Sequence, residues 1–283
     1  FETECQEGLK QYGPSKEHRP SPIVEMGLFI DRSGIPLAFC IHPGNTNEQT
    51  TLIPLEEQIL RDFSLSKFIV CTDAGLSSER NRKFNNFGGR CFITTQSIKK
   101  LKKDLRQWCL EPTGWHLKDS LDTYDISRLE DTAKNRSKLF YKQLYVEGND
   151  GKRDIDFDQT LIVTYSLKYR NYQQQIRNQQ ILRAIKAIDT EPKRIDKHSQ
   201  NDYRRFIKKT SITAYGECAA NKIYEIDQDA VQEEAQYDGF YAVYTNLDDD
   251  PSEIAAVNQG RWETEESFRI MKSEFEARPV YLK

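Results

Sequence analysis

The sequence has few of the features that mark several common classes of protein. Its longest apolar runs are five residues, as in Leu37–Ile41, far below the roughly 18 residues that cross a membrane. Six cysteines occur without a Cys-x2-Cys pair, and four histidines lie far apart. This spacing disfavours a zinc site and a disulfide framework, so a reducing cytoplasm fits. No basic-then-apolar leader follows Phe1, and we expect an excised fragment.

Charge is nearly balanced overall but unevenly distributed. The 41 Lys and Arg against 44 Asp and Glu give a net charge of -3, so there is no global signal for binding a polyanion. Residues 79–106 and 165–209 are nevertheless strongly basic, whereas residues 223–260 contain ten acids and no Lys or Arg. Such runs are typical of solvated faces, but the two basic blocks leave local phosphate binding open.

The hydrophobic pattern indicates alternating strands and helices. The first part of the chain shows the order β-β-α-β-α-β, typical of an α/β or α+β core. Thr46 with Gln49 forms a capping-box pattern, and Asp250 followed by Pro251 predicts another helix start. We expect strands at 23–30, 35–42, 67–72, 91–95, 160–165 and 239–245, and helices at 47–62, 78–87, 168–188 and 251–275.

Two carboxylates stand out from this pattern. Asp73 follows an apolar strand, where α/β folds place ligands, although a turn or helix-capping role is equally open. Glu265 shares an arc of about 100° on the last helix with several cations, a pattern that a surface ladder of ion pairs also produces. Carboxylates from two elements suit a two-metal phosphoryl-transfer site, because Mg²⁺ prefers hard oxygen ligands. The residues on that arc are Asn258, Arg261, Glu265, Phe268, Arg269 and Lys272.

These residues carry a resemblance to a known family. The chain resembles the catalytic domain of bacterial insertion-sequence DDE transposases, in the group marked by Tyr-x2-Arg-x3-Glu-x6-Lys. Arg261, Glu265 and Lys272 match that signature, and Asn258 occupies the Tyr position. Further similar blocks are Pro43-Gly44-Asn45-x2-Glu48, Thr72-Asp73-Ala74-Gly75, Asp238-Gly239, Thr245-Asn246 and Arg278-Pro279-Val280-Tyr281.

The resemblance implies a fold and a reaction. The fold would be α/β, a ribonuclease-H-like mixed sheet flanked by helices and interrupted by a mixed insertion subdomain. The core would comprise residues 1–97 and 237–283, with the insertion at 98–236. The reaction would be cleavage of transposon-end DNA and strand transfer into target DNA. It would need two Mg²⁺ ions, with Mn²⁺ as a substitute, and a homodimer on double-stranded DNA.

The resemblance also implies roles for single residues. Asp73 and Glu265 would be catalytic residues and metal ligands. Arg261 and Lys272 would contact transposon-end phosphates, with Arg269 and Asn258 beside them. In the basic part of the insertion, cations such as Arg177 and Arg183 could line a phosphate track.

One departure from the family leaves alternatives open. The family's first catalytic Asp would lie upstream of Phe1, and Asp31, in an Asp-x2-Gly setting, reads better as a hairpin turn. This fragment alone is therefore expected to be inactive. An inactive DNA-binding relic, or another ribonuclease-H-like nuclease, remains an alternative to the transposase.

Overall fold

The computed structural model describes residues 6–13, 21–31, 33–64, 68–148, 157–190, 202–212 and 221–260. Contacts divide the chain into two compact units. Among the described residues, no helix is long and apolar enough to cross a membrane. The first unit contains Phe1–Ser97, Gln143–Ile162 and Ala242–Lys283, and the second contains Ile98–Lys142 and Val163–Tyr241.

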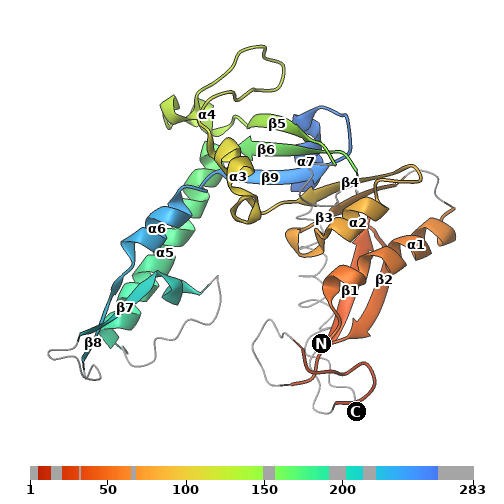
Figure 1. The fold of residues 1–283 in the computed structure, drawn as a ribbon, viewed down its shortest axis with the longest axis horizontal. Coiled ribbons are helices and arrows are strands. Elements are labelled where there is room, and N and C mark those ends of the chain that lie inside the picture. Colours follow the sequence, from red (N-terminus) through yellow and green to blue (C-terminus); the bar gives the residue numbers. More distant parts are fainter. Residues whose placement is uncertain are drawn as a thin grey trace. The chain divides into compact units, whose positions relative to one another are not determined.

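The elements follow in chain order (Figure 1). The strands are β1 (Val24–Ile30), β2 (Pro36–Pro43), β3 (Phe68–Thr72), β4 (Arg90–Thr95), β5 (Phe140–Val146), β6 (Gln159–Tyr165), β7 (Ile207–Ile212), β8 (Asn221–Ile226) and β9 (Phe240–Thr245). The helices are α1 (Leu52–Asp62), α2 (Glu79–Phe84), α3 (Lys103–Leu110), α4 (Ala133–Arg136), α5 (Leu167–Thr190), α6 (Gln228–Ala235) and α7 (Pro251–Gln259).

A mixed five-stranded sheet forms the centre of the fold. Its order is β3-β4-β9-β6-β5, with β3 parallel to β4 and β4 antiparallel to β9. Asn246 extends the β9 pairing, because its Oδ1 accepts from the Phe92 N–H of β4 at 2.9 Å. This mixed sheet with flanking helices confirms the predicted α/β class and is consistent with a ribonuclease-H-like fold.

The first unit begins with a hairpin, as the sequence predicts. β1 pairs with β2 antiparallel, and Asp31 Oδ1 accepts the N–H groups of Ser33 and Ile35 at 2.8 and 2.9 Å. Asp31 is therefore a turn residue in this structure. After the hairpin, α1 buries Leu52, Leu55 and Ile59, the spacing of an amphipathic helix.

The predicted start of the first helix was wrong. Residues 48–50 form a 3₁₀ turn capped by Asn47 rather than Thr46, and α1 begins only at Leu52. Pro54 accounts for this late start, because proline has no N–H and fits only in the first turn of a helix. At the other predicted helix, Asp250 caps α7 and Pro251 opens it, as expected. Residues 261–275 of that prediction lie outside the described residues.

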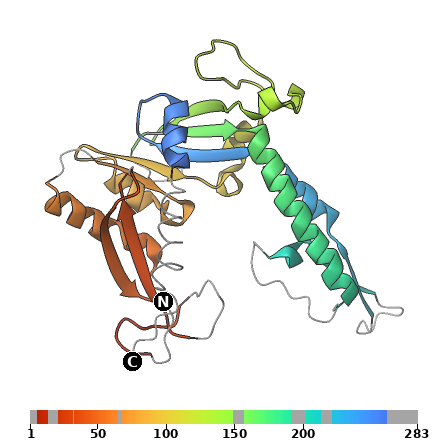
Figure 2. The same cartoon turned by 180° about the vertical axis from the view of Figure 1, so that it is seen from behind.

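The second unit contains the long helix α5 and a buried aromatic cluster. The rings of Trp115, Tyr165 and Phe240 lie 4.9–6.0 Å apart, and Trp115 is fully buried. β7 and β8 pair antiparallel and, with α6, lie alongside one flank of α5 (Figure 2). The predicted insertion, 98–236, includes Gln143–Ile162 of the first unit, and its boundaries stay a prediction.

Candidate functional site

Asp73 lies at the carboxyl end of β3, as the sequence predicts. Its Oδ1 accepts the N–H groups of Gly75 and Leu76 at 2.9 and 3.2 Å, so it caps the 3₁₀ turn 74–76. The side chain is exposed, and within the described chain Oδ2 has no hydrogen bond or ion pair. One oxygen is therefore fixed by the backbone while the other faces solvent.

A second carboxylate, Glu48, lies beside this turn. A Cβ added to Gly75 would lie 3.1 Å from Asp73 Oδ1 and 3.6 Å from Glu48 Oε2. Both carboxylates therefore border the same space beside Gly75. Like charges near one another repel, so their arrangement favours a cation between or beside them.

Asn81 links the turn that begins at Glu48 to the turn capped by Asp73. Its side-chain Nδ2 donates to the Gln49 and Leu76 carbonyls, each at 3.0 Å. One carbonyl belongs to the turn that begins at Glu48, and the other belongs to the turn capped by Asp73. Asn81 is 2% exposed, so this bridge between the backbones of the two turns is shielded from water.

A buried carboxyl group continues this network. Asn85 Nδ2 donates to both oxygens of Glu56, at 2.9 and 3.1 Å, and to the Asn81 carbonyl at 3.2 Å. Glu56 has no exposed surface, and this burial raises its pKa to about 7, opposed by the Asn85 hydrogen bond and by Arg90. Glu56, which Asn85 links to Asn81, therefore changes its protonation state near neutral pH.

Helix α7 packs against the strand that leads to Asp73. Cys71 Sγ lies 3.3 Å from Asn258 Oδ1, joining β3 to the last described turn of the helix. Asn258 is 3% exposed, so its amide faces the protein interior. This placement favours a packing role for Asn258, and its DNA contact stays a prediction.

The other residues predicted to bind DNA differ in their surroundings. Arg177 donates to both oxygens of Asp238, at 2.6 and 2.5 Å, and both side chains are nearly buried. This ion pair gives Arg177 a structural role, because a phosphate would have to displace a buried carboxylate. Arg183 is exposed on α5. Arg261, Glu265, Arg269 and Lys272 lie outside the described residues.

Two of the family-like blocks have structural explanations. Gly239 has a φ of +85°, and a Cβ there would lie 2.8 Å from the Tyr165 ring, so a larger residue is excluded. Gly44 is equally confined, because its Cβ would lie 2.2 Å from the Ile23 carbonyl oxygen. Close packing therefore explains why these two positions are glycine, without a role in the reaction.

Sequence reasoning missed the supporting residues of the site. Glu48 was noted only as part of a family-like block, and Asn81 and Glu56 were not singled out. A mid-helix Asn and a Glu on the buried stripe of α1 are unusual, since such groups are seldom buried unless paired. That irregularity was the one signal available in the sequence.

Comparison with known proteins now identifies the class. The family model described as "Transposase DDE domain" matches residues 10–283. Searches of curated proteins and of solved structures gave no match. The chain belongs to the DDE transposase domain family. Members of this family are polynucleotidyl transferases that bind DNA, generally use divalent metal ions, and act in transposition by DNA cleavage and transfer.

Among the described residues, no group of three or more His, Cys, Asp or Glu side chains could hold a metal ion. Asp73 and Glu48 nevertheless fit such an ion chemically, because hard divalent cations take carboxylate oxygens. Both side chains are exposed; backbone N–H groups hold the Asp73 carboxylate, and Asn81 links the backbones of the two turns.

Proposed function

We propose that this chain is the catalytic domain of an insertion-sequence transposase that cuts transposon-end DNA and joins the freed 3′-hydroxyl to target DNA. Asp73 and Glu265 would be the metal-binding catalytic residues, with two Mg²⁺ ions. Bound ions would polarise the scissile phosphate and activate the attacking hydroxyl. The chain itself supplies the ligands, their spacing and the cations that hold DNA.

The contact between Cys71 and Asn258 carries this proposal. Cys71 lies two residues before Asp73, and Asn258 lies seven residues before Glu265 in the sequence. Their atoms are 3.3 Å apart, so the last described turn of α7, the helix preceding Glu265, lies beside the strand that ends at Asp73. Arg261, Lys272 and Arg269 follow on the same segment, and we assign them to transposon-end phosphates. We assign no DNA contact to Arg177 or Asn258.

The test uses the protein expressed from its complete gene and a supercoiled plasmid that carries the DNA flanking that gene on both sides, because residues 1–283 alone are expected to be inactive. We expect Mg²⁺-dependent nicking at the element's ends, followed by strand-transfer products, with Mn²⁺ able to replace Mg²⁺. The variants Asp73→Asn and Glu265→Gln should both abolish nicking. Their matched controls, Glu79→Gln and Glu266→Gln, remove neighbouring carboxylates and should behave as wild type.

Other outcomes distinguish the alternatives. DNA binding without nicking in any variant would identify a DNA-binding relic. Nicking at sequences unrelated to the ends, without strand transfer, would identify another ribonuclease-H-like nuclease. Comparing the product of the complete gene with residues 1–283 tests the position expected for the first catalytic Asp: cleavage by the complete product alone would support a residue upstream of Phe1.

A further inference from the structure

Helix α5 of the second unit has an unusual charge pattern. From Leu167 to Thr190 it contains five Lys or Arg residues and one acid, Asp189 in its last turn. A long helix on a protein surface usually mixes both signs, because opposite charges three or four residues apart stabilise it. The pattern therefore calls for partners outside the helix.

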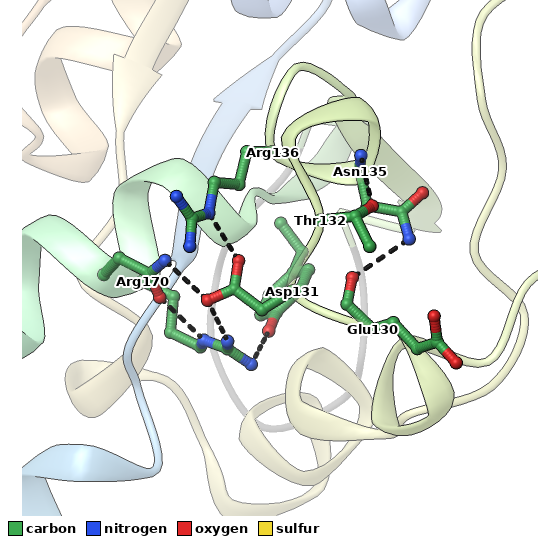
Figure 3. Close-up of polar contacts among 8 residues, drawn as sticks. Glu130, Asp131, Thr132, Asn135, Arg136 and Arg170 are labelled. Carbon is green, nitrogen blue, oxygen red and sulfur yellow. Dashed lines mark hydrogen bonds and ion pairs between the residues drawn. The ribbon is translucent and has the colours of Figure 1, made fainter.

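Two of the five cations have such partners within the second unit. Arg177 forms the nearly buried pair with Asp238. Arg170 lies 3.7 Å from Asp131, whose carboxylate points toward both Arg170 and Arg136 (Figure 3). These two arginines attach α5 to the rest of the unit.

The remaining cations lie on the opposite side of the helix. At 100° per residue, a group of exposed side chains falls within an arc of about 100°, and we call the seven of them from Lys168 to Lys186 the outward face of α5. Buried Arg177 and Ala184 lie roughly opposite it. Within the described chain none of its three cations forms an ion pair. The outward face comprises Lys168, Tyr172, Gln175, Gln179, Leu182, Arg183 and Lys186.

We propose that the outward face of α5 binds duplex DNA by entering its major groove. The face carries three positive charges, as phosphate contacts require, and the one acid of the helix, Asp189, lies outside its arc beyond Lys186. The major groove is wide enough for an α-helix. Lys168 and Lys186 lie about 27 Å apart along the helix, so they reach phosphates at either end. This inference rests on the proposed function, which makes duplex DNA the substrate.

The glutamines give the face a means of reading sequence. Gln175 and Gln179 lie between the terminal lysines and are exposed. Glutamine amides pair with the major-groove edge of adenine, and apolar side chains contact the thymine methyl group. Tyr172 and Leu182 are 58% and 65% exposed and stand beside the glutamines. The face thus combines positioning by charge with contacts suited to A·T pairs.

A helix from a second copy of the chain is the competing partner. Lys168, Tyr172, Gln175, Gln179, Leu182 and Lys186 follow alternating four- and three-residue steps, the spacing of a coiled-coil seam. Such a seam needs apolar residues at nearly every position, whereas this one has only Tyr172 and Leu182. Pairing two copies in parallel would also bring lysines together. DNA fits the charge of the face better.

The test measures DNA binding by fluorescence anisotropy in EDTA, so it does not depend on metal or cleavage. The triple variant Lys168→Gln/Arg183→Gln/Lys186→Gln removes the three charges. Because each phosphate contact contributes about 0.9 to the slope of log K against log salt, we expect the slope to fall by nearly three. The control Lys118→Gln/Arg128→Gln/Lys134→Gln makes the same charge change elsewhere on the unit and should keep most of the wild-type slope.

A second arm tests sequence reading. Wild type and Gln175→Ala/Gln179→Ala would each be used to select duplexes from a random pool. We expect the variant to bind random duplex with unchanged affinity but to lose preference for A at one or two positions. Unchanged selectivity would overturn groove reading.

Equal salt slopes for the triple variant and its control would overturn the proposal as a whole. An α5-dependent dimer, dispersed by Leu182→Lys in analytical ultracentrifugation with DNA affinity unchanged, would assign the face to a second copy. Normal binding through α5 without metal-dependent cleavage would instead contradict only the proposed function.

Discussion

Cys71 Sγ and Asn258 Oδ1 lie 3.3 Å apart, although 187 residues separate them in the sequence. This contact joins the strand that ends at Asp73 to the helix that precedes Glu265. The shared site of Asp73 and Glu265 stays part of the proposed function. The contact also shows that Asn258 contributes to packing.

Replacing Asn258 with Leu should destabilise the protein without weakening DNA binding. The side chain is buried, and losing a buried hydrogen bond costs about 1–3 kcal/mol. The midpoint of thermal unfolding should fall, while DNA affinity measured well below that midpoint should match wild type. A fall in affinity with an unchanged midpoint would restore the DNA contact that the family signature implies.

Replacing Glu48 with Gln should weaken divalent-metal binding. Glu48 Oε2 and Asp73 Oδ1 lie 3.6 and 3.1 Å from the position that a Cβ on Gly75 would occupy, so removing one charge lowers the attraction for a cation. We expect Mn²⁺ affinity to fall roughly tenfold, the scale of a lost supporting group. Isothermal titration calorimetry measures this, with exposed Glu57→Gln of α1 as the matched control. Equal affinities in the two variants would remove Glu48 from the site.

Replacing Glu56 with Gln should remove a pH dependence of stability. Burial raises the Glu56 pKa from 4.5 to about 7, so the folded protein holds this proton more tightly than the unfolded chain does. Unfolding free energy should therefore fall as pH rises from about 4.5 to 7, by roughly 3 kcal/mol, and then level off. Urea titrations between pH 5 and 8 should show a flatter profile for the variant. Identical profiles would contradict this role.

The arginines of α5 should separate stability from DNA binding. Arg177→Met leaves Asp238 buried without its partner, which costs about 3–5 kcal/mol, with little direct effect on DNA affinity in the folded protein. Arg183→Gln should leave stability unchanged and reduce affinity. Thermal unfolding and anisotropy measured on both variants would distinguish them. The reverse pattern would show that Arg177 is the phosphate ligand.

Sequence patterns predicted strands and class well, because apolar runs and turn residues are local signals. β3, β4, β6 and β9 lie within a residue or two of their predicted bounds. The start of α1 was missed because Asn47 and Pro54 outweighed the pattern at Thr46.

Side-chain roles were harder to predict because they depend on distant partners. Nothing in the basic run around Arg177 shows that Asp238, 61 residues later, neutralises it. Asp73 was recognisable from its place after a strand, but its neighbour Glu48 depends on how two turns pack. The roles of Glu265 and the cations around it stay predictions.

The most direct test of the account is Mn²⁺ binding followed by electron paramagnetic resonance. Asp73→Asn and Glu265→Gln should each weaken binding at least tenfold, because each removes a ligand of the same site. Glu79→Gln and Glu266→Gln should bind as wild type does, with circular dichroism confirming that all four variants fold. Wild-type Mn²⁺ affinity in both Asp73→Asn and Glu265→Gln would contradict the assignment of these two carboxylates to one metal centre.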